Sequence, residues 1–402
     1  MKHILLTLLL CAGATAAQGQ DWMQTNGPVE DEVLDLCIDS NSILYAVTRL
    51  GVNRSTNGGE HWTRPFLFPQ RVQIGRVCIA ANGNIIAAGD SLIYVSDDTA
   101  NTFTACYEDK RLDMNPVYSF AVSGSGRIFT GRLINLIYSD DHGKTWSELT
   151  DESLRRDIPL AVAASHDTII MHGKYHSYAS FDNGEAWTTL NPSEGNVVYK
   201  VIIIPNGQWI CLDYRRGLLA FIPDQGVWVP HSGPSSGVQF YTAEGMRDGS
   251  ILVGYSEGLF QVTDTKAWID ISSGFEGHSF HALSIARFAE DPRTNVYYVA
   301  TRGAGVWKRS APLGTTRRDP KLTAFSVTPN PTHNRFTIES SESSTGSVSI
   351  ELRDILGRIV WQQVENPATT ISIEAPGLPP GNYLLVLRTN ERTETQWVTI
   401  VE

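Results

Sequence analysis

The chain has 402 residues, with 42% hydrophobic and 19% charged residues. This composition is typical of a folded protein with a sizeable core and excludes an intrinsically disordered chain. The formal net charge of -11 argues against binding to the phosphate backbone of nucleic acids, which are therefore not an expected partner.

Residues 1–17 have the pattern of a secretory signal peptide. Lys2 precedes an apolar run, and small residues follow up to Ala17. That run is too short to span a bilayer, and no later apolar stretch is long enough, so we expect no transmembrane segment. The remaining cysteines are Cys37, Cys78, Cys106 and Cys211. Their spacing fits neither a disulfide framework nor a zinc site, and we expect no metal and no cofactor.

Residues 18–310 alternate short apolar strands with turns rich in Gly, Asn, Asp and Ser. One turn recurs with the pattern Ser-x-Asp/Asn-x-Gly-x-x-Trp. Its Ser and Asp oxygens can accept hydrogen bonds from backbone N–H groups, and its Gly permits a positive φ. Its Trp offers a large apolar surface at the start of the next strand. The three complete copies are Ser55, Asn57, Gly59 and Trp62; Ser139, Asp141, Gly143 and Trp146; and Ser180, Asp182, Gly184 and Trp187.

These turns recur at a nearly constant spacing. Including a degenerate copy, the four begin at Ser55, Ser96, Ser139 and Ser180, so they are 41 to 43 residues apart. A period of this length with four strands per repeat predicts a β-propeller. We expect seven blades, with the N-terminal segment 21–24 supplying the missing outer strand of the last one.

A second domain follows the repeats. Residues 311–321 are rich in Pro, Gly, Thr and Arg and are predicted to be a linker. Residues 322–402 alternate apolar and polar positions in short runs, which predicts a small antiparallel β-sandwich. The expected fold is therefore all-β: a seven-bladed β-propeller followed by a small C-terminal Ig-like β-sandwich.

The recurring turns resemble the Asp-box, or bacterial neuraminidase, repeat. This repeat occurs in sialidases, sortilin-like receptors, xyloglucanases and photosystem II assembly factors. The resemblance implies a propeller in which the boxes lie on the face opposite the ligand, so the box residues are structural and not catalytic. Because the members have unrelated activities, the resemblance alone implies no function.

The C-terminal domain resembles the type A sorting domain of the type IX secretion system of Bacteroidetes. The resemblance implies export across both membranes, with the secretion machinery as a partner and the cell surface or the medium as the destination. An ordinary adhesive sandwich is the alternative. The matching residues are Pro329, Asn330, Pro331, Asp354, Gly357, Gly381 and Tyr383.

Arginines and aromatic residues gather in the loops predicted for the face opposite the boxes. Guanidinium groups and aromatic rings together can bind an anionic or sugar ligand. The alternative is that each arginine is solvated or pairs with a nearby acid such as Glu32. The candidate ligand-binding residues are Arg49, Arg132, Arg215, Arg302, Tyr199, Tyr241 and His281.

We therefore expect a secreted or cell-surface propeller that binds a glycan or a protein without catalysis. The alternative is a glycoside hydrolase or lyase that acts on polysaccharide from the same face; an assembly factor is a third interpretation. The Arg-Ile-Pro motif of sialidases is absent before the first box. Facing carboxylates at the channel mouth would favour the enzyme, and an arginine–aromatic patch without them would favour binding. The catalytic residues of such an enzyme are unknown.

Overall fold

The computed structural model describes residues 21–28, 32–70, 72, 75–110, 117–133, 135–154, 157–192, 198–205, 207–213, 216–222, 227–231, 240–255, 258–263, 267–275, 285–294, 296–310, 325–328, 332, 335–340, 347–353, 359–366, 370–375, 377–379, 381–388 and 393–400. In these ranges the chain forms strands and turns, and no helix there is long and apolar enough to cross a membrane. The signal-peptide prediction concerns residues 1–17, which lie outside the described residues.

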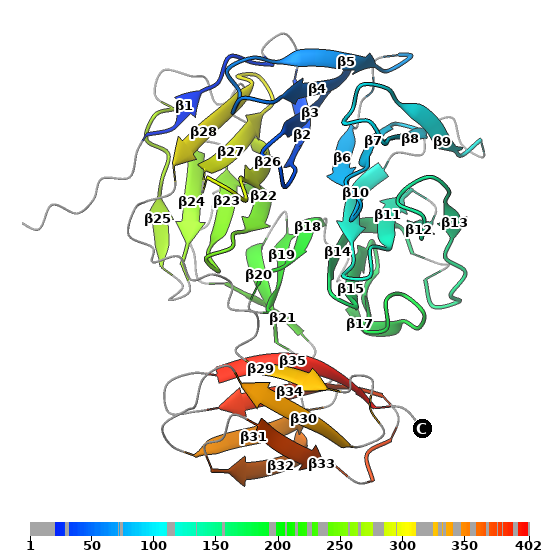
Figure 1. The fold of residues 1–402 in the computed structure, drawn as a ribbon, viewed down its shortest axis with the longest axis vertical. Helices are drawn as coiled ribbons and strands as arrows, with labels where there is room; N and C mark the ends of the chain where they lie inside the picture. Colours follow the sequence, from blue (N-terminus) through cyan, green and yellow to red (C-terminus); the bar gives the residue numbers. More distant parts are fainter. Residues whose placement is uncertain are drawn as a thin grey trace, which may run out of the picture.

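Residues 23–310 form seven antiparallel sheets of four strands, numbered here in chain order (Figure 1). Sheets 1 to 4 are β2 (Val33–Ile38), β3 (Leu44–Thr48), β4 (Gly51–Ser55) and β5 (Thr63–Leu67); β6 (Arg76–Ile79), β7 (Ile85–Gly89), β8 (Leu92–Ser96) and β9 (Thr104–Glu108); β10 (Val117–Val122), β11 (Ile128–Arg132), β12 (Leu136–Ser139) and β13 (Ser147–Glu148); and β14 (Pro159–Ser165), β15 (Thr168–Gly173), β16 (His176–Ser180) and β17 (Thr188–Pro192).

Sheets 5 to 7 are β18 (Val198–Ile203), β19 (Trp209–Asp213), β20 (Gly217–Ile222) and β21 (Val227–Pro230); β22 (Phe240–Gly245), β23 (Ile251–Tyr255), β24 (Gly258–Val262) and β25 (Trp268–Asp270); and β26 (Ile285–Glu290), β27 (Val296–Thr301), β28 (Val306–Ser310) and β1 (Met23–Gln24). The first strand of each sheet contacts the first strand of the next, and β26 contacts β2, so the seven first strands form a closed ring.

Each sheet is covered on both faces by its neighbours, which explains why the second strands are mostly apolar and almost entirely buried. In β3 and β7, for example, every residue is buried. A separate hydrophobic cluster fills each space between neighbouring sheets, including the space between sheets 7 and 1. The core of this region is therefore seven wedges around a common centre.

The N-terminal segment completes sheet 7. In β1, Met23 pairs with Lys308 and Gln24 with Trp307 of β28. The preceding residue, Trp22, is 2% exposed; its ring stacks on Phe275 with centroids 5.6 Å apart, and its Nε1 donates to the carbonyl of Ile271 at 2.8 Å. The start of the chain is thereby wedged between sheets 6 and 7.

The recurring turn has one hydrogen-bond pattern in all four copies. The Ser Oγ donates to the Asp or Asn Oδ1 at 2.7 to 3.1 Å and accepts the N–H four residues after it at 2.8 to 2.9 Å. The same Oδ1 also accepts the N–H of the residue four positions after the Asp or Asn, at 2.8 to 3.0 Å. The degenerate copy keeps this geometry although Ala100 replaces the glycine and takes a positive φ of 62°.

The glycine of each complete turn lies against the preceding sheet. A Cβ on Gly143 would come within 2.5 Å of Ile86, and a Cβ on Gly184 within 2.7 Å of Phe129. Both glycines have a positive φ, near 87° and 89°. The positive φ favours glycine at these two positions, and the close approach of the preceding sheet leaves no room for a Cβ.

The C-terminal residues form two further sheets with their own core. One sheet has the order β29 (Phe325–Thr328), β30 (Arg335–Ser340) and β33 (Thr370–Glu374); the other has the order β32 (Ile359–Glu365), β31 (Val348–Arg353), β34 (Gly381–Arg388) and β35 (Thr393–Ile400). Their hydrophobic cluster runs from Val327 to Ile400 and contains no residue of the seven-sheet ring. Tyr383 is buried there and donates to the carbonyl of Pro379 at 2.7 Å. Pro329, Asn330, Pro331, Asp354 and Gly357 lie outside the described residues.

Candidate ligand-binding pocket

An irregularity recurs in the strands that line the centre of the ring. In six of the seven first strands, the register with the second strand shifts at the second residue. Such a bulge leaves one residue unpaired and re-aims its side chain. The residues at these positions are Leu34, Tyr118, Leu160, Tyr199, Tyr241 and Ala286.

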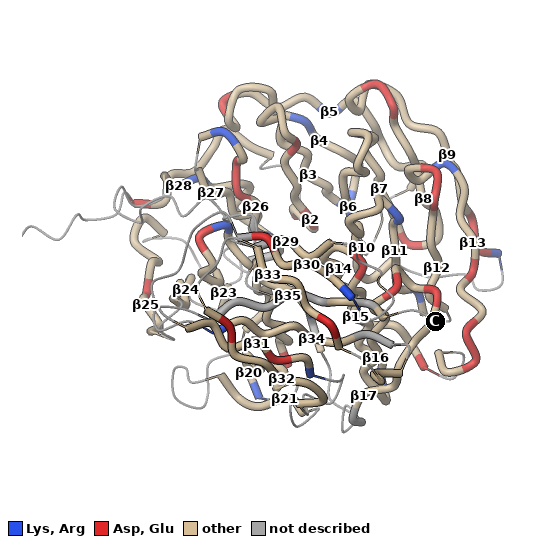
Figure 2. Tube along the Cα trace, turned by 60° about the horizontal axis from the view of Figure 1, so that its bottom comes forward, with Lys and Arg blue, Asp and Glu red and all other residues tan. Residues whose placement is uncertain are grey.

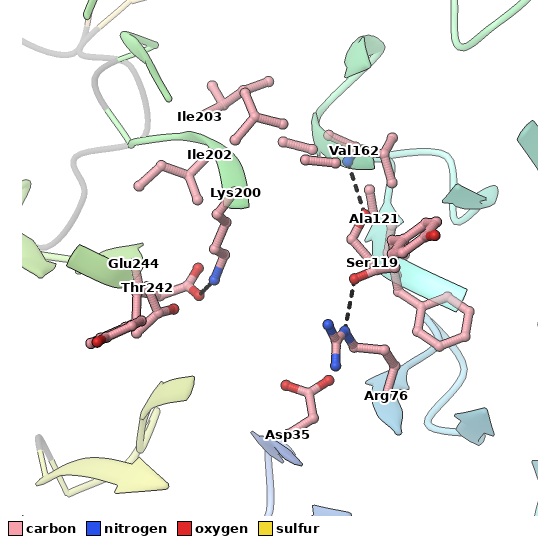
Figure 3. A pocket seen from close by; sticks show the side chains of 18 of the residues that line it. Asp35, Arg76, Ser119, Ala121, Val162, Lys200, Ile202, Ile203, Thr242 and Glu244 are labelled. Carbon is pink, nitrogen blue, oxygen red and sulfur yellow. Dashed lines mark hydrogen bonds and ion pairs between the residues drawn. The ribbon is translucent and has the colours of Figure 1, made fainter. Parts of the chain in front are cut away.

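A pocket of about 530 Å³ occupies the centre of the ring (Figure 3). The first strands of sheets 1 to 6 line it, together with Arg302 from the turn after β27. Three of the bulge residues, Leu34, Tyr118 and Tyr241, belong to this lining. One part of the wall is apolar and formed by residues 121–122, 161–164 and 201–203, and all the charged and phenolic groups belong to the rest of the lining.

Arg76, Tyr118, Tyr241 and Arg302 lie toward the face opposite the recurring turns. The recurring turns join third strands to fourth strands, so they lie at the same end of each sheet as the turns between first and second strands. A hydrogen bond connects the two kinds of turn: Asn84, between β6 and β7, donates to the carbonyl of His142 at 3.2 Å. The first strands therefore begin at the other end. Tyr118 and Tyr241 are second in their strands, and Arg302 lies in a second-to-third turn of that end. The mouth of the pocket on this face is thus polar.

The acidic groups of the pocket are engaged by protein groups. The Asp35 carboxylate is buried and accepts the N–H groups of Leu36 at 3.1 Å and Val77 at 2.9 Å. Glu244 forms an ion pair with Lys200 (Figure 3). Asp35 therefore fixes two neighbouring inner strands, because Val77 belongs to the next sheet.

The basic and phenolic groups give the pocket its chemical character. Arg76 donates through Nε to the carbonyl of Tyr118 at 2.7 Å, and burial raises the pKa of the Tyr118 phenol above its usual value. Three basic residues face two acids in the lining, within a chain of net charge -11. Acidic and basic residues are interspersed around the ring in Figure 2, so this excess of positive charge is local. Such a site favours an anionic or hydrogen-bonding ligand.

The structure brings some of the sequence-predicted residues to this pocket and places others elsewhere. Tyr241 and Arg302 line it. Arg49 lies in a turn of the same face, where its Nη2 is 2.8 Å from Glu32, the local pairing kept as an alternative. Arg132 is fully buried, with its guanidinium 5.0 Å from the centroid of the Tyr107 ring, and therefore does not reach the surface.

The remaining candidates are outside what the structure describes. Arg215 and His281 lie outside the described residues, and Tyr199 is described only as part of the β18 backbone. Within the described residues, no group of three or more His, Cys, Asp or Glu side chains is placed to hold a metal ion.

Several pocket residues are not among the candidates predicted from the sequence, which were all in predicted loops. Tyr118, Lys200 and Glu244 lie inside first strands, and their signal was a polar or aromatic residue in an otherwise apolar inner strand. Asp35 has the same signal in Val-Leu-Asp-Leu. A polar residue there is expected to face a cavity or to bind a backbone group, because an unsatisfied buried charge is costly.

Solved structures of several unrelated functions share this fold. Ycf48, in a structure titled as bound to D1 peptide, is 13% identical with a TM-score of 0.58 and covers 74% of this chain and 97% of its own. A virginiamycin B lyase from Staphylococcus aureus is 8% identical with a TM-score of 0.59 and covers 72% and 98%. At these identities the likeness shows the fold alone, which is an all-β propeller.

A third structure covers both parts of the chain. PorZ, a surface component of the type IX secretion system of Porphyromonas gingivalis, is 13% identical with a TM-score of 0.52 and covers 94% of this chain and 60% of its own. Residues 326–401 match the family described as the secretion system C-terminal sorting domain. The chain therefore carries a type IX sorting tail, which indicates a protein of the cell surface or the exterior that meets the secretion machinery. A comparison with curated protein sequences gives no significant match.

Proposed function

We propose that the protein is a non-catalytic binding protein of the cell surface or medium, which takes a glycan or a protein ligand at the central pocket, on the face opposite the recurring turns. The observation that carries this proposal is the polar mouth formed by Arg76, Arg302, Tyr118 and Tyr241. Arginine recognises carboxylate and phosphate groups through paired hydrogen bonds, and phenol rings add stacking and a further donor.

The domain assignment behind this proposal is finer than the fold alone. We take residues 1–17 as a signal peptide, the seven sheets of 18–310 as the blades of one Asp-box propeller, 311–321 as a linker and 322–402 as an Ig-like sorting domain. The shared hydrogen-bond pattern of the four turns and the pairing of β1 with β28 support this assignment.

The enzymatic alternative is a glycoside hydrolase or lyase that uses the same face. Glycosidases commonly need two carboxyl groups placed on either side of the scissile bond. The acids in the pocket lining are Asp35, which accepts two backbone N–H groups, and Glu244, which is paired with Lys200. Neither is poised as an acid or a nucleophile, and this favours binding.

A binding screen with the full chain tests the proposal. Glycan and peptide arrays would identify ligands, and mass spectrometry would show whether the bound ligand is intact. We expect intact ligands and an about fivefold to thirtyfold loss of affinity for Arg302→Ala and Tyr241→Ala, since each removes about 1–2 kcal/mol of contact. Arg335→Ala is the control, because Arg335 is an exposed arginine of the C-terminal sheets.

Two results would contradict the proposal. Shortened glycans would make the protein an enzyme. Affinities that are unchanged in both pocket variants would move the binding site away from the pocket.

A further inference from the structure

The turn between β15 and β16 is held by a buried carboxylate, Asp157, which does not belong to the pocket lining. Asp157 accepts the N–H groups of Ile158, Tyr175 and His176 at 2.8 to 2.9 Å and the hydroxyl of Tyr178 at 3.2 Å. A Cβ on Gly173 would lie 2.4 Å from the Asp157 carboxyl carbon, so the backbone of the turn packs directly on this group. The turn 174–176 is therefore rigid before any ligand arrives.

This rigid turn presents an aromatic ring to solvent. The Tyr175 side chain is 48% exposed, and it is the one aromatic residue among the exposed large hydrophobic residues of the described part of the chain. Among the aromatic residues that the structure describes, an exposed ring on an anchored turn is therefore an exception. Lys174 places its Nζ 5.3 Å from the centroid of the ring.

The turn lies on the same face as the polar mouth of the pocket. It joins a second to a third strand, as the turns of Arg49 and Arg302 do. The first strand of the same sheet, β14, contributes residues 161–164 to the pocket wall. A ligand that leaves the pocket outward along sheet 4 would therefore meet Tyr175.

We propose that the turn 174–176 is a second contact of the ligand site, at which the Tyr175 ring stacks on a sugar unit of an acidic glycan. This inference rests on the proposed function, because the acidic group of the same glycan would occupy the pocket. Sugar rings present C–H faces that pack on aromatic faces, and Lys174 and His176 provide hydrogen-bond donors beside the ring. The side chain of His176 is 43% exposed.

The surroundings of Tyr175 favour a glycan over a protein partner. Protein interfaces bury about 800 Å² per partner and centre on clusters of apolar side chains. The other exposed large hydrophobic residues of the described chain are in outer strands of the ring (Met23, Leu67 and Ile269) or in the C-terminal sheets (Ile359, Val360 and Val364). Tyr175 is thus an isolated ring among polar groups, an arrangement suited to one sugar unit.

The experiment measures binding of the full chain to three probes: an oligogalacturonate, a neutral cello-oligosaccharide and an oligoglutamate peptide. We expect the oligogalacturonate to bind most tightly. Tyr175→Ala should weaken its binding about fivefold to tenfold, and Tyr175→Phe, which keeps the ring, should stay within about twofold. Leu67→Ala is the control, because Leu67 is an exposed apolar residue of an outer strand.

The outcomes separate this inference from the proposed function. If Arg302→Ala weakens binding and Tyr175→Ala does not, the pocket remains the site and the stacking contact is wrong. If the peptide binds and neither sugar does, the acidic-glycan class is wrong. Melting curves of all variants should coincide with that of the unmodified protein, since a loss of folding would mimic a loss of binding.

Discussion

The first four sheets of the ring and the last three are joined to their neighbours by different means. Sheets 1 to 4 each carry the Ser-x-Asp/Asn turn or its degenerate copy, and the carbonyl of the residue three after the Ser accepts a hydrogen bond from a side chain of the preceding sheet. These bonds are Lys308 Nζ to Gly58 at 3.2 Å, Arg54 Nη1 to Thr99 at 2.6 Å, Asn84 Nδ2 to His142 at 3.2 Å and Arg127 Nη1 to Asn183 at 2.8 Å. Lysine, arginine and asparagine side chains thus donate to the same carbonyl of the turn in different sheets.

The spaces between sheets 4 and 7 are filled by large rings, which also occur between sheets 1 and 2 at Phe66, Phe68 and Tyr94. Trp209 stacks on Phe221 with centroids 4.7 Å apart, Phe240 lies 5.6 Å from Trp268, and Phe275 contacts both Trp22 and Trp307. A polar turn fixes the approach of two sheets through directional bonds, whereas an aromatic wedge fixes it through volume. The turn sequence can therefore decay after sheet 4 while the ring still closes.

Two carboxylates of the turns, Asp98 and Asp141, are stabilised in their charged form. Hydrogen bonds from the backbone and side chain of Thr102 hold the pKa of Asp98 at about 2. Burial acts to raise the pKa of Asp141, but hydrogen bonds from Thr145 and Ser139 outweigh it, and the pKa is lowered. Both groups therefore accept hydrogen bonds only, at any pH near neutrality.

Removing the closing wedge should have the largest effect. Trp22→Ala should lower the free energy of unfolding by about 3–5 kcal/mol, because a buried ring and its stacking partner Phe275 lose contact. Urea unfolding followed by tryptophan fluorescence would measure the change. Met23→Ala, one residue later and 51% exposed, should change stability by less than about 0.5 kcal/mol. Equal effects of the two changes would contradict the wedge.

Adding one methyl group to a turn should have a smaller effect. Gly143→Ala should cost about 2–4 kcal/mol, since it combines a positive φ with a contact of 2.5 Å to Ile86. The matched control is Gly83→Ala, where φ is also positive, at 90°, and no atom lies within 4 Å of the new Cβ, so only about 1 kcal/mol is expected. Thermal unfolding measured on both variants would separate the two contributions. A similar loss in both would show that the sheets do not press on the turn.

His172, at the boundary between sheets 4 and 5, should have the smallest effect on the free energy of unfolding at neutral pH and a larger one in acid. His172 is 2% exposed, its Nδ1 lies 2.8 Å from the Ser177 Oγ, and its ring packs on Trp228. Burial lowers the pKa of His172 to about 4, while the charges of Asp213 and Asp157 oppose this shift and that of Arg216 adds to it.

The sign of the pH effect follows from proton binding. Between the ordinary histidine pKa near 6.5 and the folded value near 4, the unfolded chain binds more protons, so stability falls as the pH falls. From pH 7 to pH 5 this group should remove about 2 kcal/mol of stability. His172→Gln should have a flatter profile over the same range in urea unfolding, and an unchanged profile would contradict the assignment.

Local chemistry made the repeat readable from the sequence. Ser, Asp and Gly at fixed spacing specify a turn through bonds within eight residues, so the turn geometry could be foreseen at Ser139–Trp146 without knowing its neighbours. The period of these turns predicted the propeller fold, and the resemblance of the C-terminal residues to a known family predicted the sorting tail. The degenerate turn at Ser96 shows that the geometry tolerates the loss of its glycine.

The central pocket could be foreseen only in part, because it depends on contacts between distant segments. Arg132 is the last residue of β11 and Arg302 follows β27, the second strands of their sheets, yet Arg132 is buried against Tyr107, whereas Arg302 lines the pocket. Whether an arginine reaches solvent depends on the neighbouring sheet, which no local pattern reveals. The sequence by itself determined the strand period and the turn chemistry, since these rest on short-range bonds. The tertiary structure alone decided which inner-strand residues share the pocket, because the closed ring brings together positions about forty residues apart at one level.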